Sequence, residues 1–136
     1  MNLKSALIKL YYLLVHADGE VNDREEALGI QMVKTEGISE PEFISALESL
    51  KKRTASNIYA ESIEELRKLN HQNRVRCVAW LCVVANADGF MDKTEWQFIY
   101  KVYHKELGLN LDEVMKVQKE LVGLTFKKSL SISAIL

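Results

Sequence analysis

The sequence predicts an all-α protein, a compact bundle of about seven helices that forms a single domain over residues 1–136. Three observations support this prediction. The apolar residues recur at intervals of three and four, as they do on one face of a helix, rather than at two. The chain contains one proline and six glycines, so few residues interrupt helices. A short motif also returns seventy residues later, which indicates two tandem helix-turn-helix units.

The first two helices follow from an apolar stripe and a capping pattern. The stripe predicts a helix over residues 3–16, which Gly19 ends because glycine readily adopts the backbone conformation of a helix end. Asn22 and Glu25 have the spacing of a capping box, in which each side chain accepts a hydrogen bond from the other residue's amide. A second helix is therefore expected to begin at Asn22 and to end near Gly37.

Three further helices are expected before the motif returns. Ser39 and Glu42 form another capping box around a proline and predict a helix that ends at about Lys52. Residues 56–70 alternate apolar and charged side chains at helical spacing, which indicates an amphipathic helix that bridges the two repeats. From Asn73 the sequence is apolar nearly all round, as is typical of a helix enclosed by others.

The internal repeat relates about residues 3–52 to about residues 73–124. After one inserted residue the correspondence continues to the end of the second unit. The matched positions are Ala17-Asp18-Gly19 with Ala87-Asp88-Gly89, Val21 with Met91, Asn22 with Asp92, Glu25 with Glu95, Gly37 with Gly108, Ser39 with Asn110, Glu42 with Glu113 and Leu50 with Leu121. The last dozen residues fit a short strand, an extended arm or another helix, and the sequence leaves this choice open.

Composition argues against several classes of partner. A formal net charge of -1 gives no overall attraction to nucleic acid or to an anionic membrane. The longest apolar run, around residues 77–84, is far shorter than the roughly 20 residues of a membrane-spanning helix, so no membrane insertion is expected. Cys77 and Cys82 match no zinc-binding pattern and are interpreted as buried thiols in a reducing compartment. We therefore expect a soluble, cytoplasmic protein.

Each repeat carries an acidic turn with the pattern Asp-Gly-x-apolar-(Asn or Asp)-x-x-Glu. This spacing places several side-chain oxygens around one loop, as a hard divalent cation requires. It matches the second half of an EF-hand calcium loop, but Leu14 and Val84 stand where that loop has its first acidic ligand. The candidate metal ligands are Asp18, Glu25, Asp88 and Glu95, with Asn22 and Asp92 as weaker supports, and the sequence does not distinguish Ca²⁺, Mg²⁺ and Zn²⁺.

The same residues also fit a purely structural interpretation. Asp-Gly is a favoured turn, and Asn or Asp followed three residues later by Glu is a helix start. Capping explains three of the four polar positions in each motif, but it does not explain why Asp precedes Gly in both copies. A shared site with four carboxylates requires the two turns to lie close together, so both interpretations stay open at this stage.

The duplicated Ala-Asp-Gly turn, followed by a glutamate in the next helix, resembles the TerB-like tellurite-resistance family. This fold also occurs in the N-terminal part of a DnaJ-like membrane co-chaperone. The resemblance covers roughly residues 3–124 and implies a compact helical bundle, no known catalysis and a divalent-cation site at the acidic turns. Carried over by residue, the implied ligands are Asp18, Glu25, Asp88 and Glu95, whereas Asn22 departs from a symmetric acidic motif.

The residues and this resemblance together favour a non-catalytic TerB-like module. It is expected to bind a divalent cation at the acidic turns, or to keep only their turn chemistry, and to act through a protein partner in a bacterial stress response. Two alternatives are a metal-dependent hydrolase, in which His16 beside the first acidic turn serves as base, and a structural helical adaptor. The chain contains no phosphate-binding loop and no recognisable nucleophile motif. Most aromatic residues are expected in the core, but an exposed Trp96 beside the second acidic turn would indicate a partner surface.

Overall fold

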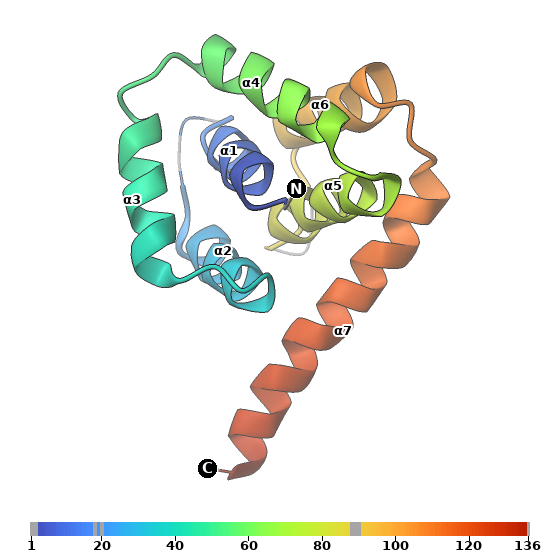
Figure 1. The fold of residues 1–136 in the computed structure, drawn as a ribbon. Helices are drawn as coiled ribbons and strands as arrows, with labels where there is room; N and C mark the ends of the chain where they lie inside the picture. The colour runs from blue at the N-terminus through green and yellow to red at the C-terminus, as the bar shows by residue number, and fades with distance from the viewer. Residues whose placement is uncertain (1–2, 18, 20, 88–90, 136) are drawn as a thin grey trace.

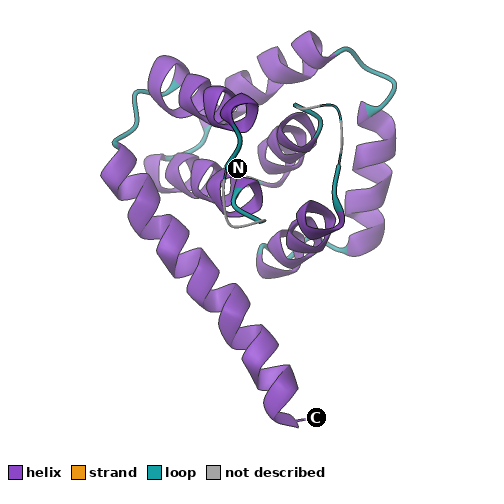
Figure 2. Ribbon diagram, turned by 180° about the vertical axis from the view of Figure 1, so that it is seen from behind, coloured by secondary structure: helices purple, strands orange, loops and turns teal. Residues whose placement is uncertain are grey.

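The computed structural model describes residues 3–17, 19, 21–87 and 91–135, with side chains up to Leu124. Every regular element in these residues is a helix, which confirms the predicted all-α class (Figure 2). The elements are α1 (Lys4–Val15), α2 (Asp23–Thr35), α3 (Glu40–Leu50), α4 (Ala55–Lys68), α5 (His71–Ala85), α6 (Lys93–Tyr100), the π-helical segment η1 (Lys101–Glu106) and α7 (Leu111–Ile135).

Two helices form the interior of the bundle. In Figure 1, α1 and α5 lie inside the ring made by α2, α3, α4 and α6. Helix α5 packs against α1, α2, α6 and α7, and every residue from Cys77 to Ala85 is buried. Its Trp80 is fully buried, and its indole N–H donates a 2.8 Å hydrogen bond to Glu36 Oε2 at the end of α2. The enclosed helix expected from the apolar run is therefore the central core element.

Polar side chains at the helix starts explain where the helices begin. Asn22, Ser39 and Asp92 each accept a hydrogen bond from the amide three residues on, as an N-cap does. Ser39 makes only this half of the predicted capping box, and the Glu42 side chain is exposed to solvent. Helix α5 begins at His71, two residues before the apolar run, because Asn70 caps it.

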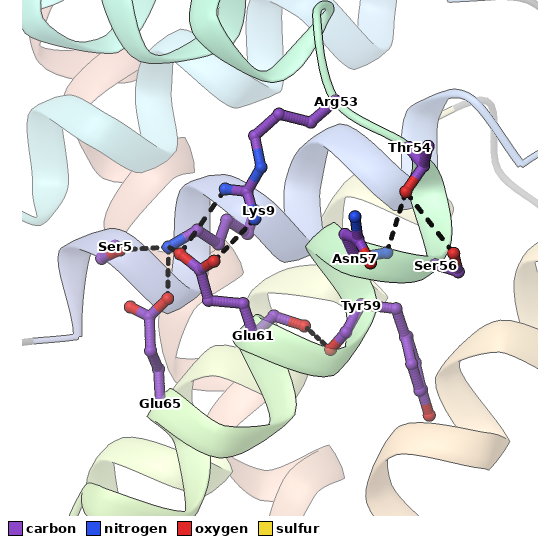
Figure 3. Close-up of polar contacts among 10 residues, drawn as sticks. Ser5, Lys9, Arg53, Thr54, Ser56, Asn57, Tyr59, Glu61 and Glu65 are labelled. Atoms are coloured by element: carbon purple, nitrogen blue, oxygen red, sulfur yellow. Dashed lines mark hydrogen bonds and ion pairs between the residues drawn. The ribbon is translucent and has the colours of Figure 1, made fainter.

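A buried lysine joins α1 to α4 (Figure 3). Lys9 is only 9% exposed, and its Nζ contacts Ser5, Glu61 and Glu65. Arg53 donates to the other Glu61 oxygen at 2.6 Å. Burial alone would lower the pKa of Lys9, but its hydrogen bonds to Glu61 and Glu65 outweigh that effect and raise it. This network fixes the bridging helix α4 against the interior helix α1.

The C-terminal helix continues far beyond the second repeat. Its first part packs on α5, with Val114 and Leu121 buried, and the remainder projects from the other helices (Figures 1 and 2). The backbone of residues 125–135 continues this helix, so the helical alternative that the sequence left open is the observed one. Side chains beyond Leu124 lie outside the described residues.

A π-helical segment occupies the place where the repeat offset changes. Counterparts are seventy positions apart up to Glu95 and seventy-one apart from Gly108 onward. The chain between them forms α6 and η1, which run on without a break. A π turn contains more residues than an α turn, so η1 can absorb one extra residue without displacing the elements that follow.

Candidate cation site at the acidic turns

The two acidic turns lead directly into α2 and α6. Glu25 and Glu95 occupy equivalent positions in the first turns of these helices, and they are only 3% and 6% exposed. Charged side chains are rarely buried to this extent without a compensating partner. Asp18 and Asp88, the other two predicted acidic ligands, lie outside the described residues.

The first turn forms a complete capping box. Glu25 N donates to Asn22 Oδ1 at 2.8 Å, and Asn22 N donates back to Glu25 Oε1 at 3.1 Å. One oxygen of the Glu25 carboxylate is therefore engaged in starting α2. Asn22, predicted as a weaker metal ligand, has a structural role here as the helix cap.

The second turn forms only the first half of this arrangement. Glu95 N donates to Asp92 Oδ1 at 2.8 Å, so Asp92 caps α6 as Asn22 caps α2. The Glu95 carboxyl, however, does not complete a capping box. Its Oε2 atom is buried and has no hydrogen-bond partner. An unpartnered carboxylate oxygen in the protein interior is costly and therefore calls for a specific explanation.

The two buried glutamates interact with each other. Burial, followed by a hydrogen bond with Glu25 and the charges of Asp92 and Glu25, raises the pKa of the Glu95 carboxyl to about 8. Two carboxylates in one buried site cannot both ionise cheaply, so Glu95 holds a proton at neutral pH when no cation is present. The fold has thus brought Glu25 at the start of α2 and Glu95 at the start of α6 to one place.

Tyr11 of α1 supports the first turn from inside. Its hydroxyl donates to the Glu25 carbonyl oxygen at 3.1 Å, and its ring crosses α2 directly above Gly29. A Cβ atom at position 29 would lie 2.6 Å from the Tyr11 ring, so only glycine permits this close approach. Burial, followed by the nearby charges of Glu26 and Glu25, raises the Tyr11 pKa, and its hydroxyl stays protonated.

The oxygen atoms at this site are of the type that a hard divalent cation binds, but the described residues supply too few of them for a full coordination shell. Glu25 and Glu95 supply carboxylate oxygens, which Ca²⁺ and Mg²⁺ prefer, and Glu95 Oε2 is available within the buried site. Among the described residues, no cluster of three or more acidic, histidine or cysteine side chains is arranged to hold a metal ion. A full coordination shell would therefore need oxygens from the turn residues Asp18 and Asp88 or from water.

The chain matches one known protein family over most of its length. Residues 4–119 match the family described as tellurite resistance protein TerB. The chain belongs to the TerB family. This match spans all of the first seven helical elements and the first part of α7, and it includes both acidic turns. No curated protein and no solved structure matches the chain.

Other predicted features of this TerB-family chain have ordinary structural roles. His16 is exposed and its ring lies against that of Tyr12, tilted by 49° with the centroids 4.4 Å apart, and it lines a groove with Val21 and Glu26. His71 contacts Glu113 on the surface. Cys77 and Cys82 are both buried, as predicted, and burial raises the pKa of Cys82 to about 12.

Two features of the TerB-family chain could not be predicted from its sequence. The first is the different geometry of the two glutamates: the Glu25 carboxylate bonds back to its own helix cap, and the Glu95 carboxyl does not. The motif is the same in both repeats, so the sequence gives no sign of this difference. The second is the ion-pair network of Lys9, which looks like an ordinary charged position within an apolar stripe. No helix in the described part of the chain is both long and apolar enough to cross a membrane.

Proposed function

We propose that this TerB-family protein is a non-catalytic module that binds a divalent cation at Glu25 and Glu95 and acts through protein contacts in a tellurite-resistance-type bacterial stress response. The observation that carries this proposal is the buried, unpartnered Oε2 atom of Glu95 beside the Glu25 carboxyl. A cation bound there would supply the missing partner and would compensate the two negative charges.

The helix starts favour charged carboxylates at this site. Helices α2 and α6 begin at the acidic turns, and their unpaired amides carry partial positive charge that favours carboxylates nearby. A cation bound at this site would replace the proton on Glu95. Asp18 and Asp88 stay the predicted additional ligands, and an all-oxygen donor set favours Ca²⁺ or Mg²⁺ over Zn²⁺.

A structural adaptor without a cation is the competing interpretation, and the caps favour it in part. Asn22, Asp92 and one oxygen of Glu25 are fully explained as helix starts. Capping does not explain why the Glu95 side chain is buried, because Asp92 already caps α6 and an exposed glutamate would serve the helix start equally well. The inward position of Glu95 is therefore the feature that separates the two interpretations.

Calorimetric titration of the chelator-treated protein with Ca²⁺, Mg²⁺ and Zn²⁺, each alone, tests the proposal. Saturable binding is expected, with release of a proton that is revealed by using two buffers of different ionisation enthalpy. Glu95→Gln should weaken binding by at least about tenfold, since it removes a charged ligand. Glu42→Gln is the matched control, because Glu42 holds the equivalent helix position in α3 but is exposed.

Two results would support the adaptor instead. One is the absence of binding heat for all three ions at millimolar concentration. The other is equal affinity in the wild type and in Glu95→Gln, which would place any bound ion elsewhere on the surface.

A further inference from the structure

A row of aromatic rings lies along the outer face of α6 and η1. Trp96, Tyr100 and His104 follow one another at four-residue intervals. The ring centroids of Trp96 and Tyr100 are 6.4 Å apart, and those of Tyr100 and His104 are 4.8 Å apart in a stacked arrangement. We call this row, together with Gln97 and the lysines described below, the aromatic–lysine face.

The exposure of Trp96 sets this face apart from the core. Trp80 is fully buried, whereas Trp96 is 38% exposed and His104 is exposed as well. An exposed tryptophan leaves a large apolar surface in water, and such residues are enriched at the centres of protein interfaces. The condition under which the sequence indicated a partner surface, an exposed Trp96 beside the second acidic turn, is therefore met.

The charge around these rings is positive. Trp96, Gln97, Tyr100, Lys101 and Lys105 line a shallow hollow of about 440 Å³ that contains no acidic side chain. Lys101 Nζ lies 4.4 Å from the centroid of the Tyr59 ring, and no ion pair within the described residues involves Lys105. Glu106, which follows Lys105 in the chain, is already bound by Tyr59 and Arg67.

Lys93 extends the positive charge to the start of α6. It is exposed, precedes Trp96 by three residues and therefore projects from a neighbouring position on the same helix. Three lysines thus accompany the aromatic row, while the chain as a whole has a net charge of -1. The complementary ligand has carboxylates to meet the lysines and an apolar side chain to fill the hollow.

We propose that the aromatic–lysine face docks an acidic peptide segment of a partner protein. Trp96 and Tyr100 contact an apolar side chain of that segment, and Lys101 and Lys105 pair with its Asp or Glu residues. A single-stranded nucleic acid also stacks on aromatic rings, but it needs a continuous basic track along its backbone, and this nearly neutral chain has only three lysines at the face.

The inference specifies the protein-contact part of the proposed function and needs no cation. The peptide experiment is therefore run in excess EDTA, so that failure of the cation site and failure of the docking face give separate results. The probe is a displayed library of short random peptides, selected in parallel on the wild-type protein and on variants.

Selection on the wild type should enrich peptides that combine several acidic residues with an aromatic or aliphatic residue. Trp96→Ala should lose this enrichment, and a labelled peptide from the selection should bind it at least about tenfold more weakly. Lys105→Glu should weaken binding about threefold or more, and added salt should do the same, because exposed charge pairs are screened. Lys119→Glu on the exposed side of α7 is the matched control and should bind as the wild type does.

Lys105→Glu also protects the test from a folding artefact, because Lys105 is exposed and circular dichroism can confirm that the variant is folded. Fluorescence gives an independent readout, since Trp80 is buried and a bound peptide can shield only Trp96 from an added quencher. The proposal is overturned if the selection enriches no acidic peptides or if Trp96→Ala retains them. It is also overturned if oligothymidylate binds this face while the acidic peptides do not.

Discussion

Glu25 and Glu95 lie seventy residues apart in the chain, and their carboxyl groups meet in the interior of the folded protein. Each follows an acidic turn and belongs to the first turn of a helix, but only Glu25 returns a hydrogen bond to its own cap. Glu95 directs an unpartnered oxygen into the buried site. This contact between the two repeats makes the acidic turns a candidate binding site rather than two separate helix starts.

The buried position of Glu95 predicts a stability that depends on pH. Its pKa is raised to about 8 in the folded protein, from an ordinary value of about 4.5. Between these values the folded state holds a proton that the unfolded state has lost, so the free energy of unfolding falls as pH rises. Glu95→Gln has no carboxyl to titrate at this position, so its free energy of unfolding should not fall with pH for this reason. It should be more stable than the wild type by about 1–3 kcal/mol near pH 9, with a smaller difference near pH 5.

Urea unfolding in EDTA at several pH values measures this difference. Glu42→Gln, at the exposed counterpart position in α3, should follow the wild-type pH dependence. A stability difference between Glu95→Gln and the wild type that is the same at all pH values would contradict a raised pKa at Glu95.

The Lys9 network predicts that removing the single charge of Lys9 will substantially lower the stability of the fold. Lys9→Met keeps most of the aliphatic stem but removes the ammonium group between Glu61 and Glu65, and it should lower the free energy of unfolding by about 1–3 kcal/mol. Lys51→Met breaks the exposed pair with Glu48 and should cost less than about 0.5 kcal/mol. If chemical denaturation gives equal losses in the free energy of unfolding for Lys9→Met and Lys51→Met, the buried ion pairs of Lys9 contribute no more to stability than an exposed pair.

Acid should reduce the contribution of the same network. Hydrogen bonds from Arg53 and then from Lys9 lower the pKa of Glu61 to about 2. A carboxyl with a lowered pKa stabilises the fold above its ordinary pKa, and this stabilisation is lost as pH falls towards 2. The difference between wild type and Lys9→Met should therefore shrink in acid, and thermal melts between about pH 6 and pH 2 should show it. A difference that grows in acid would be inconsistent with these ion pairs.

The close approach of Tyr11 and Gly29 predicts opposite results for two glycine substitutions. Gly29→Ala places a methyl group against the Tyr11 ring and should destabilise the fold by about 1–3 kcal/mol. Gly123→Ala meets no atom within 4 Å in α7 and should be neutral or slightly stabilising, because alanine favours helix. Chemical denaturation of both variants checks the pair, and an unchanged Gly29→Ala would mean that Tyr11 does not cross α2 so closely.

Much of the fold could be predicted because its signals are local. Periodic apolar residues and the caps at Asn22 and Ser39 placed α1, α2 and α3 to within two residues of their ends. The start of α5 at His71 depends on the Asn70 cap, which precedes the apolar run and which the periodicity does not reveal. The tandem duplication stays a prediction of the sequence, on which the equivalent places of Glu25 and Glu95 are based.

The candidate site could be predicted only in its composition. The repeated motif named Glu25 and Glu95, but their contact depends on how α2 and α6 pack around α1 and α5, which no local pattern encodes. The same motif gives a returned cap bond at Glu25 and an inward carboxyl at Glu95, so identical spacing led to different geometry. The exposure of Trp96 likewise depends on which elements cover α6.

The most direct test is an NMR titration that follows the side-chain carboxyl carbons of Glu25 and Glu95 as Ca²⁺ or Mg²⁺ is added to the metal-free protein near neutral pH. The account predicts saturable shifts at both carbons, loss of the proton from Glu95, and matching shifts at Gly19 that Glu95→Gln abolishes, while the carboxyl carbon of Glu42 does not move. If the carboxyl signals of Glu25 and Glu95 stay unchanged at millimolar ion, the cation site does not exist and the acidic turns serve only as helix starts.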